Sequence, residues 1–207
     1  MNIAVVGCGF FAAHYGDTLP NHPELRAVAA FDIVHSRAQA FSKRYNIPGV
    51  DSYQAILDNP DIDIVVNLVS PASRVEVSRA ALLAGKHVYS DKPLSLDRPG
   101  AKELIDLAAK QDQLLALAPS NHLGVSMQTL ARLVCEDIVG TPQLVYVEIN
   151  DCPIHNLSHN TWPSKHDALW PAETEFRVGC LWEHAGYAVG YLATGSECHI
   201  IFRGSDT

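Results

Sequence analysis

Residues 1–12 read MNIAVVGCGFFA. The apolar run at 2–7 predicts a strand buried on both faces, and the chain then passes through Gly7-x-Gly9-x-x-Ala12 into a helical stretch. The first glycine allows a tight turn, the second lets the backbone approach a pyrophosphate, and Ala12 permits close packing of the helix on the strand. This order predicts a dinucleotide site that includes Phe10 and Phe11, since a helix N-terminus favours phosphate. A glycine turn without a ligand is the alternative.

Short apolar runs continue to alternate with amphipathic stretches through the first 120 residues. This alternation predicts parallel strands joined by right-handed helical crossovers. The predicted strands are 2–7, 26–32, 63–69, 86–90 and 114–118. Capping residues mark the helix boundaries: Ser36, Ser52 and Asp97 as N-caps, and Gly85 as a C-terminal stop. The fold class is therefore α/β, with an N-terminal Rossmann domain (a doubly wound parallel sheet) followed by an incomplete second α+β domain.

We place the NAD(P)-binding Rossmann domain at 1–120 and a partial substrate and catalytic domain at 121–207. The elements predicted for the second part are a helix at 125–137, a strand at 143–149, a long loop at 150–178, a helix at 179–193 and a strand at 199–202. A sheet of one or two strands leaves open hydrogen-bonding edges. We therefore expect this region to be marginally stable, swapped between chains or supported by a partner chain, such as a homo-oligomer formed through the second-domain sheet.

Charge and composition exclude several classes of partner. Fifteen Lys and Arg stand against 23 Asp and Glu, for a net charge of -8, which repels phosphate backbones and anionic lipids. We expect no nucleic-acid partner and no membrane partner, because no apolar run approaches the roughly 18 residues of a spanning helix. Five cysteines without a C-x-x-C pair predict reduced thiols. With no basic leader at the start of the chain, a cytoplasmic location is expected.

Asp32 ends the second predicted strand, about 20 residues beyond the glycine turn, where a carboxylate accepts hydrogen bonds from the ribose hydroxyls of NAD. The same charge repels a 2′-phosphate, so NAD is predicted over NADP. His35, Ser36 and Arg37 follow closely. They either line a phosphate pocket, which makes NADP possible, or form the solvated first turn of a helix.

Asp91-Lys92-Pro93 follows the fourth predicted strand, at the carboxyl edge where doubly wound sheets bind ligands. A lysine there can donate to a substrate oxygen and lend positive charge to a neighbouring acid or base. The alternative is an ordinary turn without a function, because only the position of this tripeptide after the strand indicates a site.

Three features together resemble the Gfo/Idh/MocA family (glucose-fructose oxidoreductase and inositol dehydrogenase): VVGCGFFA at 5–12, Asp32, and AALLAGKHVYSDKPLSLD at 80–97, in which Asp91 replaces the usual Glu. The resemblance extends to about residue 193. It implies that Lys92 also contacts the cofactor and that a second domain covers the nicotinamide. The implied activity is NAD(P)-dependent hydride transfer to or from a CH–OH group of a small sugar-like or polyol-like substrate.

The resemblance also implies catalytic residues beyond Lys92. The stretch that matches the family's D-x-G-x-H segment runs from Glu183 to Tyr187, so Tyr187 stands where the family has its proton-transfer histidine. A nearby Lys92 ammonium favours the phenolate and lowers a tyrosine pKa that starts at about 10, while Glu183 orients or polarises the pair. The alternative is that Tyr187 is a packing residue and the acid-base function is lost.

Further polar and aromatic residues are weaker candidates for substrate contact. Asn121 matches a cleft-facing position of the family, or caps the helix at 125–137 instead. In the long loop, His and Trp side chains suit sugar recognition, namely His155, His159, Trp162 and Trp170. Cys152 and the two histidines, with His166 beyond, resemble zinc ligands. Pro153 and the polar residues around it indicate an irregular loop instead, so no metal is predicted.

Two rival functions follow from how the sequence ends. Members of the family generally continue well beyond this length, and the stretch after Ala193 loses the likeness. The alternative to an active oxidoreductase is therefore a non-catalytic dinucleotide-binding or regulatory protein, or a truncated inactive remnant of an enzyme of that family. A third reading is an interaction module that recruits a subunit through an exposed sheet edge.

Overall fold

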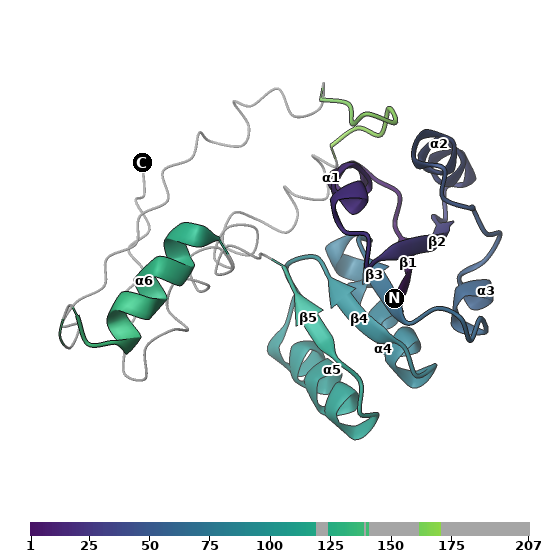
Figure 1. The fold of residues 1–207 in the computed structure, drawn as a ribbon. Helices are drawn as coiled ribbons and strands as arrows, with labels where there is room; N and C mark the ends of the chain where they lie inside the picture. Colours follow the sequence, from purple (N-terminus) through teal and green to yellow (C-terminus); the bar gives the residue numbers. More distant parts are fainter. Residues whose placement is uncertain (119–123, 139, 141–161, 171–207) are drawn as a thin grey trace, which may run out of the picture.

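The computed structural model describes residues 1–118, 124–138, 140 and 162–170. A five-stranded parallel sheet forms its centre, with the strand order β2-β1-β3-β4-β5 (Figure 1). The strands are β1 (Asn2–Val6), β2 (Arg26–Phe31), β3 (Ile64–Asn67), β4 (His87–Ser90) and β5 (Leu115–Leu117). Each lies inside its predicted range, so the α/β prediction and the five strand positions are confirmed.

Six α-helices are described: α1 (Ala12–Thr18), α2 (His35–Tyr45), α3 (Tyr53–Leu57), α4 (Arg74–Leu83), α5 (Arg98–Lys110) and α6 (Val125–Cys135). Ser52 and Asp97 cap α3 and α5 as predicted, since their side chains accept hydrogen bonds from the amides of Ala55 and Gly100. Gly85 has a φ of 72° just after α4, which fits its predicted role as a stop. No helix within the described ranges is long and apolar enough to cross a membrane.

The prediction of Ser36 as an N-cap is wrong, because α2 begins one residue earlier, at His35, with Val34 at the cap position. The amide of Val34 donates to Oδ1 of Asp32 at 2.7 Å. The carboxylate at the end of β2 therefore fixes the entry to the helix, and Ser36 already lies within its first turn.

Helices cover both faces of the sheet, as the alternating side chains of β1 show. Ala4 and Val6 belong to one buried cluster with residues of α3, α4 and α5. Ile3 and Val5 belong to a second cluster with residues of α1 and α2. The helix that follows β1 and the helix that follows β3 thus lie on opposite faces, which opens a crevice beyond the carboxyl ends of these two strands.

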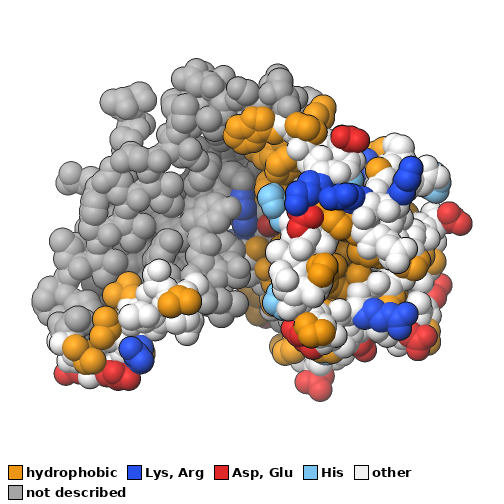
Figure 2. Space-filling model, turned by 45° about the horizontal axis from the view of Figure 1, so that its top comes forward, with side chains coloured by type: hydrophobic (Ala, Val, Ile, Leu, Met, Phe, Trp, Pro, Cys, Tyr) orange, Lys and Arg blue, Asp and Glu red, His pale blue; other side chains and the backbone are white. Residues whose placement is uncertain are grey.

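The outer side of β2 is also paired. The amide of Ala30 donates to the carbonyl of Pro48 at 2.8 Å, and the amide of Val50 donates to the carbonyl of Ala30 at 2.9 Å. This single parallel bridge, between Ala30 and Gly49, extends the sheet beyond its five strands. Figure 2 shows charged side chains of both signs interspersed over the visible face of this domain.

Candidate functional site

The turn after β1 has the form that a phosphate cradle requires. Gly7 has a φ of 93°, and a Cβ placed there would lie 2.7 Å from the backbone carbon of Leu68 and the amide nitrogen of Val69. A Cβ on Gly9 would meet nothing within 4 Å. Gly7 is therefore needed for the close approach of two strand ends, whereas the backbone at Gly9 faces open space. Ala12 is buried at the start of α1, as the predicted helix packing requires.

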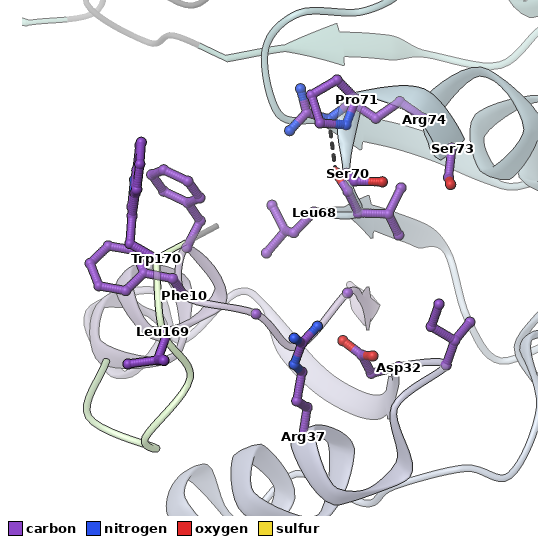
Figure 3. A pocket seen from close by; sticks show the side chains of 15 residues that line it. Phe10, Asp32, Arg37, Leu68, Ser70, Pro71, Ser73, Arg74, Leu169 and Trp170 are labelled. Carbon is purple, nitrogen blue, oxygen red and sulfur yellow. Dashed lines mark hydrogen bonds between the residues drawn. The ribbon is translucent and has the colours of Figure 1, made fainter. Parts of the chain in front are cut away.

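A cavity of about 320 Å³ lies at this crevice. It is lined by residues from the turns after β1, β2 and β3, from the first turns of α2 and α4, and from the 162–170 segment: Gly7, Gly9, Phe10, Phe11, Asp32, Ile33, Arg37, Leu68, Val69, Ser70, Pro71, Ser73, Arg74, Leu169 and Trp170. In Figure 3, Phe10 and Trp170 lie together on one side, Asp32 and Arg37 on another, and Arg74 beside Pro71 on a third. The structure thus brings the predicted glycine turn and Asp32 into one cavity.

Both carboxylate oxygens of Asp32 already accept backbone hydrogen bonds. Oδ2 accepts from the amide of Cys8 at 2.8 Å, and Oδ1 accepts from the amide of Val34 at 2.7 Å. Each carboxylate oxygen has two lone pairs, so Asp32 can also accept from ligand hydroxyls. Arg37 lines the cavity with Asp32, so a cation and a carboxylate face the same space.

Cys8, between the two glycines, is buried and has a packing role. Burial, and after it the negative charge of Asp32, raise the pKa of its thiol to about 12. The thiol therefore stays protonated at neutral pH, and its Sγ lies 3.6 Å from the carbonyl oxygen of Phe31. A protonated, buried thiol is not a nucleophile.

The 162–170 segment is anchored to the glycine turn by His166. Nε2 of this buried histidine donates to the carbonyl of Cys8 at 2.9 Å, and its Nδ1 lies 3.2 Å from Oγ of Ser164. The ring packs edge-on against Phe41, with the two ring centroids 5.4 Å apart. Because both ring nitrogens are hydrogen-bonded within the chain, His166 as placed here is not a metal ligand. Sequence reasoning missed this anchor, which joins residues far apart in the chain.

Lys92 lies in the predicted place, in the turn that follows β4 at the carboxyl edge of the sheet. Its side chain and that of Asp91 are buried, and Lys92 is not among the residues that line the cavity. The buried guanidinium of Arg74 contacts this turn: Nη2 donates to Oδ2 of Asp91 at 2.9 Å, and Nη1 donates to the carbonyls of Lys92 and Pro93. Arg74 also lines the cavity and was not singled out from the sequence.

Several predicted site residues and elements lie outside the described residues. They are Asn121, Cys152, His155, His159, Glu183 and Tyr187, with the strand at 143–149, the helix at 179–193 and the strand at 199–202. Of the two loop tryptophans that are described, Trp170 lines the cavity, whereas Trp162 is 44% exposed and does not. Among the described residues there is no group of three potential metal-ligating side chains.

Comparison with known proteins agrees with this geometry. The chain is 27% identical over 195 residues to an uncharacterized oxidoreductase of Synechocystis sp., covering 93% of this chain and 50% of that protein. It is 34% identical over 120 residues to a dTDP-3,4-didehydro-2,6-dideoxy-alpha-D-glucose 3-reductase of Saccharopolyspora spinosa, covering 56% and 35%. The chain spans half or less of the length of these curated relatives.

A solved structure shares the fold and contains the cofactor. It is a 3-ketoreductase from Actinomadura kijaniata in complex with NADP, 28% identical, with a TM-score of 0.61 over 68% of this chain and 45% of that one. Residues 1–118 match the family model for oxidoreductases with an NAD-binding Rossmann fold. The matched stretch spans the five strands of the described sheet and the glycine turn. The chain therefore belongs to the Gfo/Idh/MocA oxidoreductase family.

Proposed function

We propose that this chain is an NAD(P)-dependent oxidoreductase that transfers a hydride between nicotinamide and a CH–OH or carbonyl group of a sugar-like or polyol-like substrate. The observation that carries the proposal is the cavity in which Gly9, Asp32 and Arg74 meet. It is lined by the glycine turn, by Asp32 and by Arg74, and the Arg74 guanidinium contacts the turn that holds Lys92. The sugar-nucleotide reductase and the ketoreductase among its relatives support the substrate class.

The residues present fit a dinucleotide. The open backbone at Gly9 accepts a pyrophosphate, Asp32 accepts from ribose hydroxyls, and Phe10 and Trp170 offer apolar surface. When bound, the cofactor supplies hydride chemistry at its nicotinamide ring. NAD is the preferred form, because Asp32 repels a 2′-phosphate, while Arg37 keeps NADP acceptable.

Proton transfer is assigned to Lys92 together with Tyr187, with Glu183 orienting the pair. The Lys92 ammonium stabilises the phenolate of Tyr187, which takes or returns the proton of the substrate hydroxyl as the hydride moves. Asn121, His155 and Trp162 are proposed as substrate contacts. A cytoplasmic location is proposed from the free thiols Cys8 and Cys135.

The test is calorimetric titration of the 207-residue protein with NADH and with NADPH, followed by a screen of ketosugars, sugars and polyols for a change in NADH absorbance. Saturable binding and turnover of a member of this set support the proposal. Binding without turnover favours the non-catalytic dinucleotide-binding protein instead. Failure to bind either cofactor contradicts both functions.

A further inference from the structure

Arg74 is a buried arginine whose contacts join two turns at the carboxyl edge of the sheet. Nε donates to the carbonyl of Val69 at 3.1 Å, in the turn after β3. The rest of the guanidinium reaches the turn after β4, where it meets the Asp91 carboxylate and the carbonyls of Lys92 and Pro93. The side chain of Arg74 is 4% exposed and that of Asp91 is 12% exposed.

The backbone that carries Arg74 is held as well. The buried amide of Asn67, at the end of β3, donates to the carbonyl of Arg74 at 3.1 Å and lies 2.9 Å from Oγ of Ser78. The first turn of α4 is therefore fixed to the sheet before the arginine side chain crosses to the neighbouring turn. This gives the guanidinium a rigid base.

We propose that Arg74 is a positioning residue that holds the 91–93 turn against the turn after β3 and thereby places Lys92 at the edge of the cofactor cavity. The importance of this placement for catalysis rests on the function proposed above. The placement itself is a structural claim that is testable without a substrate. Arg74 acts through the turn and is not assigned to the chemical step.

Only an arginine satisfies this set of acceptors. Its planar fork has five N–H donors, so it can serve a carboxylate and several carbonyls in different directions at once. A lysine in its place has a single nitrogen, which can reach the Asp91 carboxylate but not both turns. A buried charge of this kind is tolerated only when its partners are satisfied, and removal of the guanidinium leaves Asp91 without its cation.

The same helix offers a matched control. Arg79 also forms a forked pair with a carboxylate, and its Nη2 lies 2.8 Å from Oε2 of Glu103 on α5. That pair is exposed, with the Arg79 side chain at 37%, and it does not line the cavity. Loss of Arg79 therefore removes an arginine–carboxylate pair from α4 and leaves the 91–93 turn intact.

The experiment measures how fast an amine-acylating reagent modifies Lys92, by mass spectrometry, in the wild type, Arg74→Ala, Arg74→Lys and Arg79→Ala. Two other lysines serve as internal references. Lys86 is buried next to the opposite end of β4 and donates to the carbonyl of Asn59, so it reports global unfolding. The side chain of Lys102 is 70% exposed, so its acylation rate reports differences in reagent reactivity between samples.

We expect Lys92 in Arg74→Ala to be acylated about tenfold faster than in the wild type. This corresponds to a loss of about 1.4 kcal/mol in the free energy that holds the 91–93 turn in place. Lys86 and Lys102 should react at the wild-type rate. Guanidinium chloride at non-denaturing millimolar concentration should slow Lys92 again by filling the vacated site, whereas sodium chloride at equal ionic strength should not. Arg79→Ala should behave as the wild type.

Arg74→Lys keeps the bulk and charge, so it covers the case in which Arg74→Ala fails to fold. It should remain folded and show faster acylation of Lys92 that guanidinium does not reverse, because the lysine occupies the site. The proposal is overturned if Lys92 is acylated at the wild-type rate in a folded Arg74 variant. It is also overturned if, in both Arg74 variants, the acylation rate of Lys86 rises as much as that of Lys92. NADH binding by the wild type is measured separately, so the acylation result can be interpreted even if the protein does not bind the cofactor.

Discussion

The carboxylate of Asp32 accepts a hydrogen bond from the backbone amide of Cys8, with 2.8 Å between Oδ2 and the nitrogen. The end of β2 thereby fixes the middle of the glycine turn that follows β1. One side chain has two tasks at this point, because it shapes the turn and also faces the cavity where a ribose would bind.

Asp32→Ala should weaken NADH more than NADPH, because the lost acceptor serves the ribose hydroxyls and its charge no longer repels a 2′-phosphate. Hydrogen bonds to a charged group are worth about 1.5–3 kcal/mol, so a loss of at least about tenfold in NADH affinity is expected. Arg37→Ala should do the reverse and weaken NADPH more. Calorimetry measures all four affinities, and equal weakening of both cofactors by Asp32→Ala would contradict the ribose assignment.

The two glycines of the turn should respond differently to alanine. Gly7→Ala forces a Cβ against the backbone of Leu68 at a φ of 93°, so we expect at least about 3 kcal/mol of lost stability. Gly9→Ala meets no neighbouring atom, and its stability should stay within about 0.5 kcal/mol of the wild type. Its methyl group, however, occupies the pyrophosphate approach and should weaken NADH.

Urea unfolding and NADH titration together separate these two effects. A Gly9→Ala protein that is folded and binds NADH at the wild-type affinity would show that the pyrophosphate does not approach the backbone there. A stable Gly7→Ala protein would show that the two strand ends can move apart.

Loss of His166 should release the 162–170 segment from the glycine turn. His166→Ala removes the hydrogen bond to the Cys8 carbonyl and the contact with Phe41. If about 1.4 kcal/mol of docking is lost, the open population rises about tenfold, and trypsin should cut after Lys165 faster in proportion.

Asp17→Asn is the control for the histidine variant. It weakens the ion pair between Lys165 and Asp17, which are 2.9 Å apart, and the contact between Asp17 and Tyr45, but it leaves the His166 ring in place, and such surface pairs contribute about 0–1 kcal/mol. Cleavage in Asp17→Asn should therefore change little. Equal cleavage rates in His166→Ala and the wild type would show that the histidine does not anchor the segment.

Lys92→Ala should preserve NADH binding and abolish turnover, because the ammonium is assigned to proton transfer and Lys92 is not among the residues that line the cavity. Lys92→Met, which keeps most of the buried volume, should give the same result. Lys102→Ala, on the exposed face of α5, should turn over normally. Undiminished activity in either Lys92 variant would remove this lysine from the mechanism.

The buried thiol of Cys8 should make the free energy of unfolding depend on pH above about 9. Its pKa rises from 9.0 to about 12 on folding, so the folded protein keeps a proton that the unfolded chain loses. The stabilisation is fully present below pH 9 and falls as pH rises toward 12, by up to about 1.4 kcal/mol per pH unit.

The useful window for that measurement lies between pH 9 and 10. The partly buried tyrosines Tyr15 and Tyr53 also have raised pKa values, but their contribution begins above pH 10. Urea unfolding in this window should show a shallower pH slope for Cys8→Ala than for the wild type. Cys135→Ala, at an exposed thiol, should keep the wild-type slope, and an unchanged slope in Cys8→Ala would contradict the assignment.

The parts of the fold that local chemistry determines were predictable from the sequence. The strands are continuous apolar runs, the caps at Ser52 and Asp97 are short polar residues before helical stretches, and the glycine turn has its own spacing. Ser36 was mispredicted for a local reason. Asp32, four residues earlier, takes the amide of Val34 and starts the helix sooner.

The contacts that complete the cavity depend on residues distant in the chain. Arg74 stands at the start of a helix, a position where an arginine is ordinarily solvated, and only the tertiary fold brings Asp91 to it. In the same way, no local pattern marks His166, in a loop rich in histidine, as a partner of the Cys8 carbonyl. Both side chains donate to backbone carbonyls, and because every residue has a carbonyl, the sequence does not indicate which one is the acceptor.

The bridge at Ala30 affects how this sheet meets other molecules. The segment beyond β2 is joined to it by a single bridge, through the Pro48 carbonyl and the Val50 amide, so it offers an incoming strand only a short row of donors and acceptors. At the other end of the strand order, β5 is three residues long. Short borders are poor templates for strand addition, so the described sheet resists aggregation through added β-strands at both of its borders.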